Sequence, residues 1–106
     1  MRRSLGVYLA DIIDSCETIL GGLAGIDFAS YEQDRILRSA VEREFILIGE
    51  AVAHIRDLDS EVFSGISNAA VIVGFRNVLT HDYASIDDAT VYGVATSDLS
   101  LLRDEC

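Results

Sequence analysis

The chain has 106 residues, half of them hydrophobic, and its 18 acidic and eight basic side chains give a formal net charge of −10. This length fits one domain, residues 1–106, built around one hydrophobic core. The apolar share is more than a small helical domain easily hides, which favours burial of one face against a second subunit. The acidity argues against non-specific nucleic-acid binding, so an RNA substrate would require a local cleft of positive potential.

Three classes of protein are disfavoured by the sequence. No stretch is long enough to cross a membrane, and Asp11 and Asp14 interrupt the apolar segment that a signal peptide would need. Cys16 and Cys106 are too few and too scattered for a disulfide framework or a zinc site. We therefore expect a cytoplasmic protein that binds no metal and no other cofactor.

Apolar side chains at helical spacing predict two long amphipathic helices, one over residues 5–23 and one reaching residue 55. Ser30 and Gln33 fit a capping box that opens the second of these helices. Residues 57–67 are expected to form a connector with a short helical turn near residues 61–63.

A third helix is expected to begin at Ser67, and its Gly74 would allow a neighbour's backbone to approach closely. Residues 85–88 match another N-terminal cap, and Val91 and Leu102 mark the extent of a last helix. No strand is predicted. Short connections between helices favour an all-α, up-and-down bundle of four to five helices.

Residues 73–83 concentrate the chemistry of the chain. Arg76 is a permanent cation and His81 exchanges protons near neutral pH, which are the two groups that metal-free phosphodiester chemistry needs. Five residues of helix rotate about 500°, so the two side chains point about 140° apart on one helix. Either the helix ends near Thr80 and the chain turns His81 back, or the pair is assembled with a second copy of the motif. Asn77, four residues before His81, is the candidate for orienting the imidazole.

The segment from Arg76 to Tyr83 matches the pattern Arg-x4-His-x-Tyr and resembles the signature of HepT-like toxins, a branch of the HEPN ribonucleases. Residues 40–52 resemble the second long helix of that family, and residues 72–77 resemble its approach to the signature. The likeness extends over nearly the whole chain. One departure is the absence of proline, which relatives often carry near residues 63–68.

The resemblance implies a HEPN-like bundle, a two-fold dimer and a metal-independent endoribonuclease. In this reading His81 helps to move the proton of an RNA 2′-hydroxyl and Arg76 stabilises the scissile phosphate, which leaves a 2′,3′-cyclic phosphate. The resemblance also implies the toxin of a type VII-like toxin–antitoxin system, neutralised when a cognate minimal nucleotidyltransferase antitoxin adenylylates Tyr83. On a continuous helix Arg76 and Tyr83 lie within about 20° of each other, so an added phosphate could pair with Arg76.

Other readings remain open at this point. The chain could be a non-catalytic HEPN-like module that binds a nucleotidyltransferase, or a plain helical interaction dimer, with Arg76 paired to a carboxylate. Glu50 and His54 have a metal-compatible spacing, but two ligands are not a site, and a surface ion pair or a histidine near a helix C-terminus is favoured. Glu44 could either support Arg76 or lie on a solvated flank.

Overall fold

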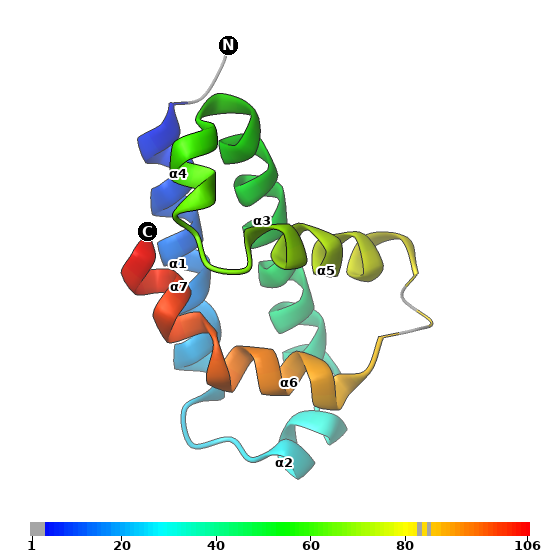
Figure 1. Cartoon of the computed structure of the whole chain (residues 1–106). Helices are drawn as coiled ribbons and strands as arrows, with labels where there is room; N and C mark the ends of the chain where they lie inside the picture. The colour runs from blue at the N-terminus through cyan, green and yellow to red at the C-terminus, as the bar shows by residue number, and fades with distance from the viewer. Residues whose placement is uncertain (1–3, 83, 85) are drawn as a thin grey trace.

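The computed structural model describes residues 4–82, 84 and 86–106, and the regular structure in these ranges is entirely helical (Figure 1). The predicted all-α class is therefore confirmed. Seven helices follow one another in the described part of the chain: α1 (Leu5–Leu23), α2 (Phe28–Gln33), α3 (Arg35–Leu58), α4 (Ser60–Ser64), α5 (Ala69–His81), α6 (Asp88–Ser97) and α7 (Leu99–Glu105).

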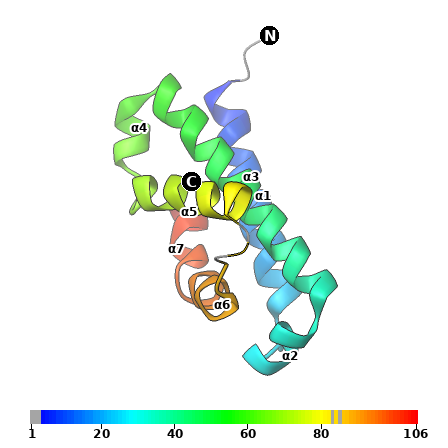
Figure 2. The same cartoon turned by 90° about the vertical axis from the view of Figure 1, so that its right-hand side faces the viewer.

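The two long helices α1 and α3 pack side by side in opposite directions and form the long axis of the molecule (Figure 1). α5 crosses α3, and α7 packs on α1. In Figure 2 α6 is seen nearly end-on, while α3 runs obliquely past α5. No helix in the described ranges is both long and apolar enough to cross a membrane. The most deeply buried side chains of the core are Ile12, Cys16, Ile19, Tyr31, Ile48, Val52, Ile55, Val91, Ala95 and Leu99.

Aspartates, rather than a serine capping box, begin most of these helices. Asp27 accepts a hydrogen bond from the Ser30 amide at 2.8 Å, and Asp34 accepts one from Leu37 at 3.0 Å. The predicted box is therefore wrong, because Ser30 lies inside α2 and Asp34 opens α3. An ionised carboxylate is favoured at a helix N-terminus by the helix dipole. The backbone hydrogen bond from Ser30 accordingly lowers the pKa of Asp27.

The start of α5 also differs from its prediction by two residues. Asn68 adopts a left-handed conformation with φ 59°, and the helix begins at Ala69. Ser67 does not cap α5, because its amide and hydroxyl donate to the Glu105 carboxylate of α7 at 3.1 and 2.7 Å. The short helical turn predicted in the connector is confirmed as α4.

The single last helix of the prediction is divided at Asp98 into α6 and α7. Thr96 donates its hydroxyl to the Tyr92 carbonyl at 2.9 Å, a back-bond that competes with regular helix. The break turns Leu99 and Leu102 inward, where both are buried. Asp87 caps α6 by accepting from the Ala89 amide, whereas Ser85 of the predicted cap lies outside the described residues.

Candidate active site

Arg76 lies on the inner side of α5, where this helix crosses α3 at Gly49. A Cβ atom added at the buried Gly49 would lie 2.7 Å from Arg76 Cγ and closer still to Arg76 Cβ. Glycine therefore lets the two helices approach more closely than any other residue would allow. Within one chain this close approach is made by Gly49 and not by the predicted Gly74, where an added Cβ meets nothing within 4 Å.

The Arg76 side chain is half-buried, and its Nε atom is buried without a hydrogen-bond partner. No carboxylate in the described part of the chain forms an ion pair with it, so the reading of Arg76 as an arginine paired with a carboxylate is not supported. Glu44 forms no ion pair with Arg76 either, and it lines a hollow between α1 and α3 with Tyr8 and His54. Arg76 is thus held in place by packing while its charge stays unneutralised.

His81 is the last residue of α5 and is exposed. α5 is continuous from Arg76 to His81, so the helix does not end early to turn the imidazole back. The two side chains point about 140° apart, and one chain does not bring them together. Asn77 is exposed near His81, but no hydrogen bond joins this pair of described residues, so the orienting role of Asn77 stays a prediction.

Tyr83 lies outside the described residues. α5 ends at His81, and Asp82 follows with a non-helical φ of −140°. The alignment predicted between Arg76 and Tyr83 concerns a residue outside the described ones and stays a prediction, and Tyr83 follows His81 by two residues in the sequence.

The outer face of α5 carries small or short side chains next to His81. Ala70, Gly74 and Asn77 are exposed and lie on the same side of the helix as His81, at intervals of three or four residues. Space at Gly74 is open, as shown by the added Cβ. This smooth face is uncovered by the rest of the described chain.

The comparisons with known proteins agree with the resemblance of the motif. A family model described as "Ribonuclease HepT-like" matches residues 11–106. The chain belongs to the HepT-like ribonuclease family.

Individual relatives of this HepT-like chain carry ribonuclease names. "Putative RNase MJ1380" of Methanocaldococcus jannaschii is 28% identical over 104 residues, which cover 98% of this chain and 94% of that protein. "Putative RNase TTE0752" of Caldanaerobacter subterraneus is 26% identical over 98 residues, which cover 92% of this chain and 87% of that protein. No solved structure gives a significant match.

Unpaired arginines of the HepT-like chain gather on α3 and α5. Of the described arginines, Arg38, Arg56 and Arg103 form ion pairs, with Asp88, Asp57 and Asp104. Arg35, Arg43 and Arg76 form none, although acidic side chains outnumber basic ones by 18 to eight.

Viewed along the axis of α3, its two unpaired arginines both project to the same side of Gly49. Arg35 is rotated from Gly49 by about 40° and Arg43 by about 120°. Arg35 is the first residue of α3, where the helix dipole disfavours a cation. Sequence patterns marked Arg43 on the long helix as a residue of interest but did not single out Gly49 or Arg35. The available signal was a glycine in the middle of a long predicted helix, where glycine is usually unfavourable.

The alternative metal site at Glu50 and His54 gains no further ligand. The described residues contain no group of three or more side chains able to hold a metal ion together. The His54 ring stacks on Tyr8 instead, with ring centroids 4.9 Å apart and planes 14° from parallel. This stacking accounts for the position of the imidazole.

Proposed function

We propose that this HepT-like ribonuclease is a metal-independent endoribonuclease that uses Arg76 and His81. The observation that carries the proposal is the seating of Arg76 on Gly49, which fixes an unpaired guanidinium on the same helix as His81. A guanidinium held by packing is preorganised to stabilise charge on a phosphate.

The proposed reaction is an internal transfer at phosphorus. His81 takes the proton of the RNA 2′-hydroxyl, and the 2′-oxygen forms a bond to the adjacent phosphorus. The bond from phosphorus to the 5′-oxygen breaks, and this leaving oxygen takes up a proton. Arg76 stabilises the extra negative charge on the non-bridging oxygens, and the product is a 2′,3′-cyclic phosphate.

Because one chain does not bring Arg76 and His81 together, we propose that a two-fold dimer assembles the site. The small residues Ala70, Gly74 and Asn77 would let two α5 helices cross closely, which brings the two copies of the motif together near the two-fold axis. Such a contact is isologous, as in most dimers. It would also collect the arginines of both copies in one cleft and so offset the acidity of the chain.

We propose that Arg35 and Arg43 contact phosphates that flank the scissile bond. Along α3 these residues lie about 21 and 9 Å from Gly49, which fits a strand of RNA following the helix away from Arg76. Binding would be salt-sensitive, because each phosphate contact releases counterions.

We propose that the protein acts in the cytoplasm as the toxin of a type VII-like system. A cognate minimal nucleotidyltransferase antitoxin would transfer AMP from ATP to Tyr83, with the tyrosine oxygen bonding to the α-phosphorus and pyrophosphate leaving. The new phosphodiester anion could pair with the unneutralised Arg76 and exclude the RNA phosphate. Intact-mass spectrometry after co-expression should show adenylyl increments that disappear in Tyr83→Phe, and this variant should still cleave RNA.

Cleavage of a labelled single-stranded RNA in the presence of EDTA tests the chemistry. The wild type should produce 2′,3′-cyclic ends, whereas Arg76→Ala and His81→Ala should lower the rate by at least about 100-fold, with unchanged helicity by circular dichroism. RNA with a 2′-deoxy substitution at the cleavage position is the control and should not be cut. Loss of wild-type cleavage in EDTA, restored by magnesium, would contradict the metal-independent mechanism.

A mixing experiment tests the shared site. Arg76→Ala and His81→Ala proteins are each inactive, but a mixed dimer would hold one intact pair, with Arg76 from one copy and His81 from the other. Co-refolding the two variants should therefore restore a substantial fraction of wild-type activity. Persistent inactivity of a verified mixed dimer would place both residues of each site in the same chain.

The second candidate is a non-catalytic HEPN-like module that binds a nucleotidyltransferase. It is favoured by the net charge of −10 and by the separation of Arg76 from His81 within one chain. A chain that binds the nucleotidyltransferase but leaves RNA intact under all these conditions would establish this candidate.

A further inference from the structure

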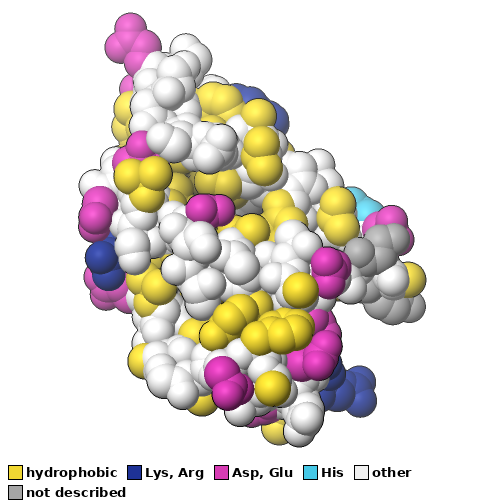
Figure 3. Space-filling model, turned by 60° about the horizontal axis from the view of Figure 1, so that its bottom comes forward, with side chains coloured by type: hydrophobic (Ala, Val, Ile, Leu, Met, Phe, Trp, Pro, Cys, Tyr) yellow, Lys and Arg dark blue, Asp and Glu magenta, His cyan; other side chains and the backbone are white. Residues whose placement is uncertain are grey.

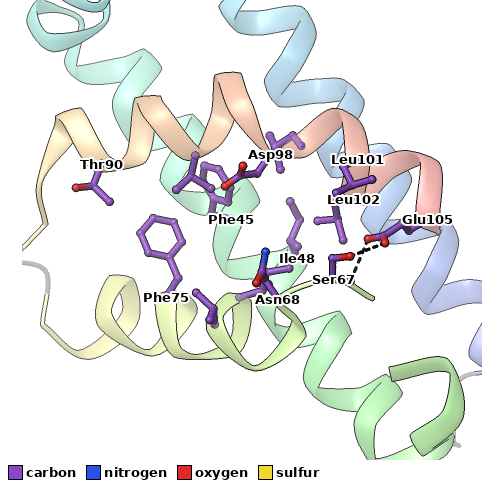
Figure 4. A pocket seen from close by; sticks show the side chains of 14 residues that line it. Phe45, Ile48, Ser67, Asn68, Phe75, Thr90, Asp98, Leu101, Leu102 and Glu105 are labelled. Atoms are coloured by element: carbon purple, nitrogen blue, oxygen red, sulfur yellow. Dashed lines mark hydrogen bonds between the residues drawn. The ribbon is translucent and has the colours of Figure 1, made fainter. Parts of the chain in front are cut away.

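An open apolar groove, which we call the α5–α6 groove, lies between α5 and α6, with Phe45 and Ile48 of α3 among its lining residues. It consists of two adjoining hollows of about 230 and 170 Å³ that share Phe75 and Thr90. In Figure 4, Phe75 projects from α5 towards α6, while Leu101 and Leu102 approach from α7. Hydrogen bonds from Ser67 to Glu105 join α7 to the connector that precedes α5, next to the part of the groove lined by Leu101 and Leu102.

Large apolar side chains of the groove remain unusually exposed. Val71 is 69% exposed, Leu101 54% and Val78 41%. Val71 and Leu101 line the larger hollow, and Val78 lines the smaller one. Figure 3 shows apolar side chains beside a hollow, with carboxylates among them. Exposed apolar surface gathered along a groove marks an interaction site rather than scattered surface residues.

The charges at the groove select the kind of partner. Asp98 and Glu105 line the larger hollow and Asp87 lines the smaller one, while no Lys, Arg or His is among the described lining residues. An acidic rim repels RNA phosphates and anionic lipid headgroups. It also disfavours a second copy of this chain at the groove, since that copy carries the same net charge of −10, and the proposed dimer uses the outer face of α5 instead. The complementary partner is apolar along one stripe and basic on both flanks.

The walls of the groove select the conformation of that partner. They are helices, whose backbone groups are already hydrogen-bonded, so an extended segment would find no strand edge to pair with. A helix brings its own backbone hydrogen bonds into an apolar groove, whereas an extended chain would leave unpaired groups there. α5 has 13 residues and is about 20 Å long, so a partner helix of three to four turns matches the length of the groove.

We propose that the α5–α6 groove is a docking site for a basic amphipathic helix of a partner protein. Apolar side chains of that helix enter beside Phe75 and between Val71 and Leu101, and its Lys or Arg side chains lie against Asp98 and Asp87. Val78 precedes His81 by less than one turn, so an occupant of the full groove ends next to the proposed catalytic histidine. Docking is a property of the groove, and it stands whether or not the protein cleaves RNA.

The test is fluorescence anisotropy with a labelled helical peptide of about 14 residues, built from Leu at core positions and Lys on the flanks. The wild-type protein should bind it saturably, and the same peptide with Glu in place of Lys should bind at least about tenfold more weakly. Val71→Asp and Leu101→Asp should each weaken binding by about tenfold or more. Ile36→Asp is the matched control, because Ile36 is 84% exposed on α3 and lies outside the groove.

Reversal of the rim charge completes the test. Asp98→Lys should weaken the Lys-bearing peptide and reduce the salt dependence of its binding. Absence of peptide binding, equal binding to the Glu peptide, or equal binding by Val71→Asp and the wild type would each overturn the proposal. A wild-type dimer that Val71→Asp with Leu101→Asp converts to monomer would show that a second copy occupies the groove. Loss of RNA binding in these two variants would assign the groove to nucleic acid.

Discussion

The two sides of α5 are held in opposite ways. Towards α3 the helix is locked, with Arg76 packed on Gly49 so closely that a single added methyl group has no room. Towards α6 it is open, with Val71 and Val78 exposed along an apolar groove. The difference teaches that the crossing with α3 fixes the position of the motif helix, while its other faces remain available to a second copy, to RNA or to a partner.

The largest expected effect is on stability, at the aromatic pair that joins the two sides. Phe45 of α3 is 5% exposed and packs edge-on against the half-buried Phe75 of α5, with centroids 5.3 Å apart. Phe45→Ala should lower the free energy of unfolding by about 3–5 kcal/mol. Phe75→Ala should cost less than half as much, because the groove already exposes part of its ring.

Urea denaturation measures both changes. Equal losses would break the comparison, since they would mean that the ring of Phe75 is as well packed as the ring of Phe45.

Two glycines, Gly49 at the crossing of α3 with α5 and Gly74 on the outer face of α5, should respond to alanine with opposite signs. Gly49→Ala forces α5 away from α3 and should destabilise the fold by about 1–3 kcal/mol, less the helix-propensity gain. RNA cleavage should fall with it, because Arg76 is displaced. Gly74→Ala meets open space and should stabilise the isolated chain by about 0.5–1 kcal/mol.

Thermal unfolding monitored by circular dichroism distinguishes these signs. A larger residue at the open position, Gly74→Leu, sharpens the test, because it should dissociate the proposed dimer in sedimentation experiments while the fold persists. Gly21→Leu is the control, since Gly21 is also exposed in a helix with nothing near its added Cβ.

A smaller effect is expected at Arg35 and Arg43, the two unpaired arginines of α3. Arg35→Ala and Arg43→Ala should each weaken binding of single-stranded RNA by several-fold and reduce the slope of log affinity against log salt by about 0.7. Arg56→Ala should change neither quantity, because Arg56 lies at the other end of α3 and is paired with Asp57 at 3.5 Å. Filter binding at several salt concentrations checks this prediction. An equal change in Arg56→Ala would mean that the effect comes from the net charge and not from local phosphate contacts.

The smallest effect concerns Glu42 of α3, which lies on the N-terminal side of the crossing with α5 at Gly49. Partial burial raises the pKa of its carboxyl, as does the neighbouring Asp88, while Arg38 opposes them. A raised pKa means that the stabilising contribution is complete below the ordinary pKa of Glu and is lost as pH rises through the raised value. Glu42→Gln cannot ionise, so it should gain on the wild type as pH rises towards 7, by no more than a few tenths of a kcal/mol at this partly exposed position.

Chemical denaturation at several pH values between 3 and 7, in steps of about one pH unit, measures this difference. If the difference in the free energy of unfolding between the wild type and Glu42→Gln stays constant with pH, titration of Glu42 is not the cause of that difference.

The sequence predicted the helices better than their ends. Helical periodicity located both long helices and the motif helix, because an amphipathic stripe depends only on residue spacing. Ser30 was mistaken for a cap and Ser67 for the start of the motif helix, since several polar residues compete to cap a helix and the positions of their neighbours decide which one does. Ser67 is bound by Glu105, which is 38 residues away in the chain.

The candidate site was likewise predicted in its residues and not in its geometry. Arg76 and His81 were predicted because their chemistry and spacing stand in one short segment, and their catalytic roles stay predictions. Gly49 was missed because its importance arises from a contact with Arg76, 27 residues later. The assignment of Tyr83, the dimer and the single domain stay predictions.

The sequence by itself determined the all-α class, the motif and the membership in a ribonuclease family, since these depend on periodicity and on residues close together in the chain. Only the tertiary structure decided which side of α5 is locked and which is open. It also decided that the motif helix continues through Arg76 to His81, so that one chain holds the two groups apart. The physical reason is that close packing, as of Arg76 on Gly49, is set by residues brought together from distant parts of the chain, and no local pattern encodes that distance.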